Sequence, residues 1–259
     1  MENCMSNTPN HPNTITTLLR DDKARTEGMT FLFQPIINSN TNSEWGSEIL
    51  TRWFHPKTGQ IPPEKLMKFI GSARLDCVFL KMQLDRILEE SRKVNKTGCQ
   101  EYFFVTINLS RRFIDNEQII KTLTECSKKL HSKKIKITIE LYEGNSYNTP
   151  SITRNILKLQ EKGIKVALDD FGARRSNIES LISTPIDIVK IDKSIVQKIS
   201  TSHICPRILS SLLCICREMK LEAIAEGVEN SDQYELLKNI GFELFQGYYF
   251  SAPRPKLFQ

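Results

Sequence analysis

The sequence lacks any long uninterrupted run of apolar residues. A helix that crosses a bilayer needs about 20 consecutive, mainly apolar residues. The N-terminal segment is rich in Asn, Thr and charge and has no apolar core of the kind found in a secretory signal peptide. We therefore expect a cytoplasmic protein with no membrane partner, in which residues 1–28 form a mobile N-terminal arm and residues 29–259 form one folded domain.

Histidine is scarce, and cysteine has no metal-binding spacing. The four histidines lie far apart in the sequence, at His11, His55, His131 and His203. A histidine-based metal site or nucleophile is therefore not expected. The seven cysteines are odd in number and irregularly spaced, so we interpret them as reduced thiols, most of them buried.

The chain has no stripe in which aromatic and basic residues alternate, and no recognition-helix pattern. Its net charge of +6 and isoelectric point near 8.9 would by themselves allow nucleic-acid binding. The lysines and arginines are dispersed along the chain, however, which favours an ordinary solvated surface. We expect no nucleic-acid partner, and the opposite hypothesis rests on the net charge alone.

What the sequence does contain is a short apolar run that ends in two adjacent carboxylates, in residues 166–172 (VALDDFG). The run is too short for a helix and predicts a buried strand, with Asp169 and Asp170 at its carboxyl end. Two adjacent carboxylates repel each other, and a divalent cation between them is the usual compensation. The alternative interpretation is a solvated Asp-Asp turn that closes the strand.

The same design recurs along the chain. Seven strand-like segments lie at residues 47–53, 103–108, 135–140, 166–170, 186–190, 221–226 and 242–246. Segments of helical composition lie among them, at residues 64–73, 75–94, 116–130, 151–162, 206–219 and 233–239. Alternation of strands and helices predicts an α/β fold with a parallel sheet.

Six of the predicted strands end in a polar residue, and the first, residues 47–53, carries Glu48 within an otherwise apolar segment. These residues are Glu48, Asn108, Glu140, Asp169, Asp170, Lys190, Glu226 and Gln246. In a β/α barrel the carboxyl ends of the strands converge on one face, where the active site is built. A loop cap explains any one of these residues, but not all of them together. Because carboxylate and amide oxygens are hard donors, the set selects Mg²⁺ or Mn²⁺, with enough ligands for two ions.

Eight motifs occur in a fixed order between residues 30 and 255: FQPI (33–36), EILTRW (48–53), NLS (108–110), ELYE (140–143), DDFG (169–172), KID (190–192), AEGVE (225–229) and QGYYF (246–250). Together they resemble the EAL family of cyclic di-GMP phosphodiesterases. The resemblance implies a (β/α)8 TIM-like barrel of the EAL type over residues 29–259. It also implies metal-dependent hydrolysis of the bacterial second messenger cyclic di-GMP to linear pGpG.

The resemblance gives roles to the polar strand ends. The implied metal ligands are Glu48, Asn108, Glu140, Asp169, Asp170 and Glu226, with Asp169 bridging two ions of Mg²⁺ or Mn²⁺. The implied catalytic residues are Lys190, Glu48 and Gln246. Lys190 would contact the attacking water or the phosphate. A salt bridge to the acidic residues is its alternative role, and the two roles are compatible.

A second group of residues would hold the nucleotide. The implied substrate-binding residues are Gln34, Leu50, Arg52, Asp192 and Pro253. Arg52 follows Glu48 by four positions and so faces the same side of a strand, where a guanidinium suits a phosphate. The other four would contact the guanine bases, although Leu50 and Pro253 fit packing and turn roles equally well.

One loop departs from the family pattern. Residues 173–177 read ARRSN where relatives have Thr-Gly-Tyr-Ser-Ser, and Tyr142 replaces a threonine. Glu143, which braces this loop in relatives, is retained. In relatives the loop also supports a dimer interface. The departure keeps a second hypothesis open: a catalytically impaired protein that acts as a cyclic di-GMP receptor or as a regulator that docks on a protein partner. It also leaves open whether the chain forms the homodimer that the resemblance implies. A cyclase role has no motif to support it.

Overall fold

The computed structural model describes residues 28–55, 59–72, 74–93, 102–142, 149–173 and 178–258. Apart from Gly28, the predicted N-terminal arm lies outside these ranges. Within them, no helix is both long and apolar enough to cross a membrane.

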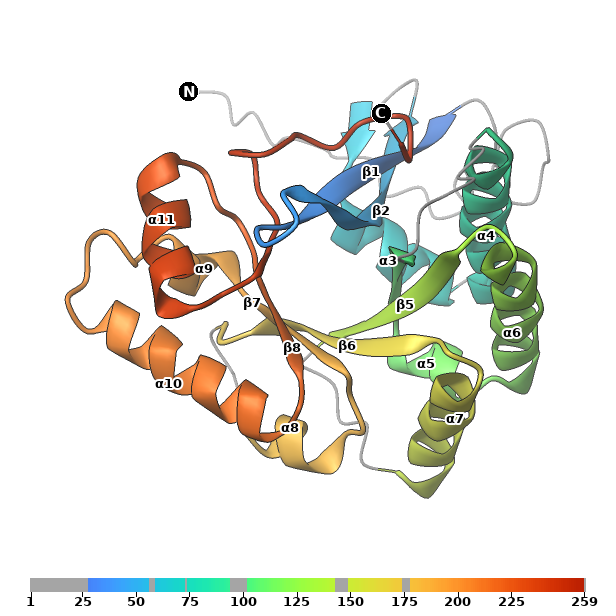
Figure 1. Ribbon diagram of the computed structural model, residues 1–259. Helices are drawn as coiled ribbons and strands as arrows, with labels where there is room; N and C mark the ends of the chain where they lie inside the picture. The colour runs from blue at the N-terminus through green and yellow to red at the C-terminus, as the bar shows by residue number, and fades with distance from the viewer. Residues whose placement is uncertain are drawn as a thin grey trace, which may run out of the picture.

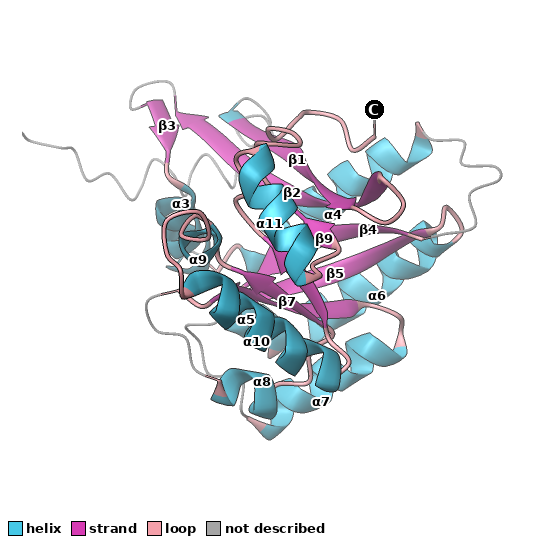
Figure 2. Cartoon of the chain, turned by 60° about the vertical axis from the view of Figure 1, so that its left-hand side comes forward, coloured by secondary structure: helices cyan, strands magenta, loops and turns pink. Residues whose placement is uncertain are grey.

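Eight strands close into a barrel, with helices packed around its outside (Figures 1 and 2). The order around the barrel is β1-β9-β8-β7-β6-β5-β4-β2, with β2 pairing back onto β1 and β3 added beside β2. The strands are β1 (Met29–Asn38), β2 (Ser43–His55), β3 (Gly59–Ile61), β4 (Phe103–Leu109), β5 (Ile135–Tyr142), β6 (Lys165–Phe171), β7 (Ile188–Ile191), β8 (Glu222–Ala225) and β9 (Leu244–Phe245). This closed barrel confirms the predicted (β/α)8 TIM-like fold.

The helices lie between consecutive strands. They are α3 (Pro63–Ser72), α4 (Asp76–Arg92), α5 (Arg111–Ile114), α6 (Glu117–His131), α7 (Pro150–Glu161), α8 (Glu179–Ser183), α9 (Lys193–Val196), α10 (Cys205–Glu218) and α11 (Ser231–Ile240). Each of the six predicted helical segments corresponds to one of the longer helices. The short helices α5, α8 and α9 were not predicted. Cys126, Cys205 and Cys216 are buried as expected, whereas Cys77 and Cys214 are exposed.

The prediction of a parallel sheet is wrong at two strands. The short strand β3 pairs antiparallel with β2. β1 runs antiparallel to both of its neighbours, β2 and β9, whereas β2 and β4 to β9 follow one another in parallel. β1 was also absent from the predicted strands. It joins β2 through a short hairpin, and strands connected in this way must be antiparallel because a parallel pair needs a long crossover.

Strand alternation builds the barrel interior in layers. Side chains two positions apart on a strand face the same side. In four strands an apolar interior residue precedes a polar one by two positions: Ala167 and Asp169, Ile188 and Lys190, Ile224 and Glu226, Leu244 and Gln246. The apolar residues, together with Ile36, form a separate buried cluster (the apolar plug) against which Trp45 packs. The polar layer therefore rests on an apolar floor.

Candidate functional site

Lys190 lies among four carboxyl groups (the acidic cluster: Glu48, Glu140, Asp169 and Glu226). The distances from its Nζ are 2.7 Å to Glu226 Oε1, 2.9 Å to Glu140 Oε1, 3.1 Å to Asp169 Oδ1 and 3.3 Å to Glu48 Oε2. The lysine side chain is 1% exposed. Three of the carboxyl groups come from β2, β5 and β6, and the fourth directly follows β8. Residues far apart in the sequence thus meet at one end of the barrel.

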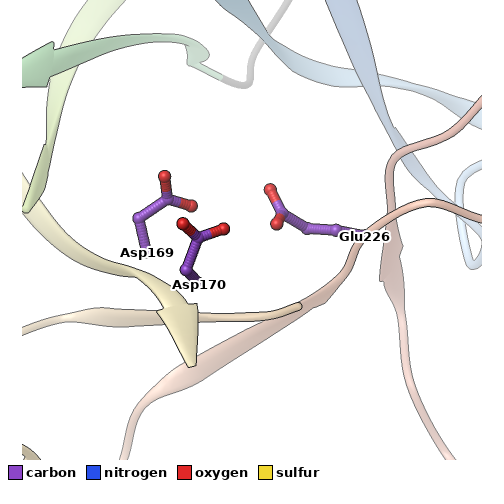
Figure 3. Close-up of side chains that lie close together, drawn as sticks. All are labelled: Asp169, Asp170 and Glu226. Atoms are coloured by element: carbon purple, nitrogen blue, oxygen red, sulfur yellow. The ribbon is translucent and has the colours of Figure 1, made fainter. Parts of the chain in front are cut away.

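Asp169, Asp170 and Glu226 bring carboxylate oxygens within 4.8 Å of one another. Figure 3 shows the two aspartates at the end of β6, with Glu226 pointing toward them from across the site. Regular alternation would turn neighbouring side chains to opposite faces. Here Asp170 has a φ of 57°, and the pairing of β6 with β7 shifts between Leu168 and Phe171. This irregularity lets both aspartates face the site.

Two amide groups hold Glu48 in place. Asn108 Nδ2 donates to Glu48 Oε1 at 2.8 Å, and Gln246 Nε2 donates to Glu48 Oε2 at 2.9 Å. In each amide the nitrogen donates to Glu48, so the amide oxygen is the atom that can serve as a metal ligand. Within the described residues, the buried atoms Gln246 Oε1 and Glu140 Oε2 have no hydrogen-bond partner. Orphaned buried oxygens are rare in proteins, and hard oxygen donors suit Mg²⁺ or Mn²⁺, so the residues present fit such an ion.

Three carboxyl groups have raised pKa values. Burial, followed by the neighbouring Glu48, raises the pKa of Glu140 well above its usual range. Burial outweighs the attraction of Lys190 and, with the nearby Asp169, raises the pKa of Glu226 to about 8. Burial and then Asp169 raise the pKa of Asp170 to about 6. These groups resist ionisation because negative charge is concentrated in a place that water scarcely reaches.

Glu48 and Lys190 are shifted toward their charged forms. Burial opposes ionisation of Glu48, but the Lys190 ammonium and the two amide donors outweigh it and lower the pKa of this carboxyl. Burial likewise disfavours the Lys190 ammonium, yet the surrounding carboxylates, Asp169 first, raise its pKa well above the usual value. Among the described residues, a single ammonium faces four carboxyl groups, so the site can accommodate further positive charge.

Two cavities meet at the aspartate pair. The polar cavity, of about 320 Å³, is lined in part by Glu48, Lys190 and Glu226. The larger cavity, of about 780 Å³, is lined in part by Asn108 and Glu140 and by apolar residues of α3 and α4. Asp169 and Asp170 line both. A ligand that reaches into both cavities must therefore pass over the acidic residues.

The predicted site residues that the structure describes fall on these surfaces with one exception. The six predicted metal ligands, Lys190 and Gln246 lie in or beside the acidic cluster. Gln34 and Asp192 line the polar cavity, while Leu50 and Arg52 line the larger one. Pro253 is half-buried and is not among the residues that line either cavity.

Some features of the site were not predicted, and others lie outside the described residues. Lys193, Gln197, Glu229 and Tyr248 also line the polar cavity. Gly247 lines it as well, and a Cβ there would lie 2.0 Å from the Val228 carbonyl oxygen. A glycine directly after a polar strand end was the available signal for this close approach. The predicted brace Glu143 and residues 174–177 of the unusual loop fall outside the described ranges.

The fold and the site define the class of this protein as a TIM-like barrel with an acidic centre at the carboxyl ends of its strands. Comparison with known protein families agrees with this class. Residues 18–253 match the model of the EAL domain, so the chain belongs to the EAL domain family.

Relatives and solved structures of this family cover most of the chain. The sequence is 33% identical over 223 residues to the "Cyclic di-GMP phosphodiesterase PdeL" of Escherichia coli K12, covering 86% of this chain and 61% of that protein. The crystal structure of an EAL domain protein from Listeria monocytogenes EGD-e has a TM-score of 0.73 and 26% identity, covering 97% of this chain and 96% of that one. The "PaMucR Phosphodiesterase, c-di-GMP complex" has a TM-score of 0.78 at 22% identity, covering 93% and 98%. The chain thus spans less than two thirds of the length of PdeL.

Proposed function

We propose that this protein is a metal-dependent phosphodiesterase that opens cyclic di-GMP to linear pGpG. The observation that carries the proposal is the acidic cluster, in which four carboxyl groups share one buried ammonium. Within the part of the chain that the structure describes, Glu140 Oε2 of this cluster and the neighbouring Gln246 Oε1 are buried without a hydrogen-bond partner. Such a site suits divalent cations, and divalent cations suit phosphodiester hydrolysis. PdeL, which is named as a phosphodiesterase for this nucleotide, supports the choice of substrate.

The proposed ligands are the groups whose oxygens converge. Mg²⁺ or Mn²⁺ at two positions would be held by Glu48, Asn108, Glu140, Asp169, Asp170 and Glu226, with Asp169 shared between the positions. When bound, such ions lower the pKa of water and neutralise charge on the attacking and leaving oxygens of a phosphodiester.

The chain's own residues would orient the reactants. Lys190, whose pKa the surrounding carboxylates raise, would place a positive charge beside the attacking water or the phosphate. Asn108 and Gln246 fix the Glu48 carboxylate through both of its oxygens. This support keeps a ligand group in a single orientation, which is how a surrounding shell tunes a metal site.

The two cavities would accept the two halves of the nucleotide. Arg52 supplies a guanidinium in the larger cavity, where it can grip a phosphate that is not cleaved. Gln34 and Asp192 supply polar groups in the polar cavity. A solved phosphodiesterase of the same fold, PaMucR, is a complex with cyclic di-GMP.

Product analysis by chromatography tests the proposal. The purified protein is incubated with cyclic di-GMP and Mg²⁺ or Mn²⁺, beside Glu48→Ala and a Ca²⁺ control. We expect metal-dependent pGpG that disappears in the variant. Absence of product with retained nucleotide binding by calorimetry would instead favour the receptor hypothesis, and absence of both would favour docking on a protein partner.

A further inference from the structure

Gln83 of α4 carries an unsatisfied polar group beside the larger cavity. Its side chain is among the buried polar residues, at 2% exposure. Within the described residues, its Oε1 atom is buried and has no hydrogen-bond partner. An unpaired amide oxygen in an apolar setting costs stability, on the order of 1–3 kcal/mol by mutational measures. Packing alone therefore does not explain why a glutamine occupies this buried position of α4.

The surroundings of Gln83 suggest that reason. Gln83 lines the larger cavity together with Phe79, which lies one helical turn earlier on α4, and with Leu66 and Met67 of α3. Apolar walls interrupted by a small number of polar groups are typical of a small-molecule pocket that fixes the orientation of its ligand. The same cavity reaches Asp169 at the acidic cluster. A flat, largely apolar ring with a polar edge would match such a pocket.

We propose that the Gln83 amide reads the hydrogen-bonding edge of a guanine base in the larger cavity. The inference rests on the proposed function for the identity of the nucleotide. Guanine carries two adjacent hydrogen-bond donors, the N1 imino group and the exocyclic amino group. An amide oxygen can accept a hydrogen bond from either of them. The last torsion of a glutamine side chain is broad, so a turn of the amide presents its oxygen to the cavity while the rest of the side chain stays in place.

A pocket that hydrogen-bonds its ligand rejects an analogue that lacks the matching group, because the protein's own polar group is then left unpaired. Cyclic di-inosine monophosphate is such an analogue, since hypoxanthine lacks the exocyclic amino group. The wild-type protein should bind cyclic di-GMP more tightly than the inosine compound by about tenfold. Gln83→Leu, of similar volume but without the amide, should bring the ratio of the two dissociation constants close to one.

Stability separates this role from a structural one. If Gln83 served only the fold, Gln83→Leu would lower the melting temperature and leave the ratio unchanged. Because the amide oxygen is unsatisfied, we expect Gln83→Leu to melt at or above the wild-type temperature while losing discrimination. Gln83→Glu, which keeps an acceptor, should retain a preference for guanine.

The experiment is calorimetric titration of both cyclic dinucleotides in Ca²⁺, with melting curves for each variant. Gln160→Leu is the matched control, because the Gln160 amide already donates to Asp187 at 2.9 Å and to the Pro185 carbonyl at 3.2 Å; it should lose stability and keep the binding ratio. An unchanged ratio in Gln83→Leu overturns the inference, as does a wild-type protein that binds neither dinucleotide. If the wild-type protein distinguishes the two dinucleotides but produces no pGpG, the inference about Gln83 holds and the proposed hydrolase activity is refuted.

Discussion

The two ends of the barrel each hold a lysine on a strand, and the two lysines lie in different electrostatic settings. Lys165, at the start of β6, pairs with Glu222 at the start of β8. Its Nζ also lies 4.5 Å from the ring centre of Phe104 and 5.6 Å from that of Trp45. Lys190, at the other end, faces four carboxyl groups. The side chain of Lys165 is 27% exposed, against 1% for Lys190.

The difference lies in charge balance. At the amino end one cation meets one anion in partial contact with water, and two aromatic faces complete the neutral arrangement. At the carboxyl end, Lys190 is almost completely buried and the carboxyl groups around it outnumber its ammonium, which costs stability in the absence of a further positive charge. Lys165 therefore stabilises the amino end of the barrel, whereas Lys190 partly neutralises a site that has room for metal ions. Between the two ends lies the apolar plug.

The largest expected effect is that of Lys190→Met. Removing one partner from a buried charged network leaves the others uncompensated, which typically costs about 3–5 kcal/mol. We expect a loss of that size in urea unfolding of the metal-free protein, together with a fall in turnover of at least about 100-fold. Part of the lost stability should return on adding Mg²⁺, since a bound cation neutralises the same carboxylates.

That prediction has a clear contrary result. If Lys190→Met unfolds at the same urea concentration as the wild type, Lys190 does not neutralise the acidic cluster. If stability falls but turnover persists, the charge of Lys190 serves the fold alone. The two barrel ends would then differ only in how strongly their lysines stabilise the protein.

The second prediction concerns the apolar plug. Ile36 is fully buried in it, and Ile36→Ala should destabilise the protein by about 2–5 kcal/mol, with Ile36→Val costing about 0.5–1.5 kcal/mol. Turnover per folded molecule should stay close to wild type, because the plug lies beneath the polar layer. Urea unfolding and steady-state kinetics check both parts. A kinetic defect in Ile36→Val would show that the floor also sets the geometry of the site.

The strand pattern explains how much could be predicted from the sequence. The polar strand ends were visible because each interrupts an apolar run, and their convergence followed from the barrel topology. β1 was missed because no helix separates it from β2, so it breaks the alternation that the prediction relied on. The short helices α5, α8 and α9 carry too few residues for a periodic signal.

Other properties of the site depend on long-range geometry. The sequence suggested a salt bridge for Lys190 but could not give its four partners, which come from separate strands. The positive φ of Asp170 and the orphaned oxygen of Gln83 arise from local register and packing, and neither leaves a pattern in the sequence.

The third prediction is a pH dependence of metal binding. Glu226 and Asp170 have pKa values raised to about 8 and about 6 from ordinary values of 4.5 and 3.8. A cation must displace their protons, so its affinity should fall as pH drops from 8 to 6, by up to about tenfold per unit for each proton released. Metal-free stability should move the other way. The folded state binds these protons more tightly than the unfolded one, so stability is gained on acidification from pH 8 toward 4.5.

Calorimetry with Mn²⁺ and melting curves in a chelator measure the two trends. Glu226→Gln is the control: above pH 8, where the wild-type carboxyl is ionised, it should raise the metal-free melting temperature by about 2–6 °C, since it removes a buried negative charge, and it should weaken Mn²⁺ binding. A metal affinity that stays flat from pH 6 to 8 would show that these carboxyl groups do not hold the ion.

The smallest expected effect is that of Lys165→Met, the counterpart of Lys190→Met at the opposite end of the barrel. A partly exposed ion pair and its cation–π contacts contribute about 1 kcal/mol together, and the methionine retains most of the apolar contact with Phe104 and Trp45. We expect a slight loss of stability that shrinks in 1 M NaCl, because exposed charges are screened, and no change in Mn²⁺ affinity or turnover. Equal losses from the two lysine variants would mean that burial, rather than the excess of carboxyl groups around Lys190, governs both ends. A loss of stability seen only in Lys190→Met would instead show that the excess of carboxyl groups, and with it the capacity to bind cations, lies at the carboxyl end of the barrel alone.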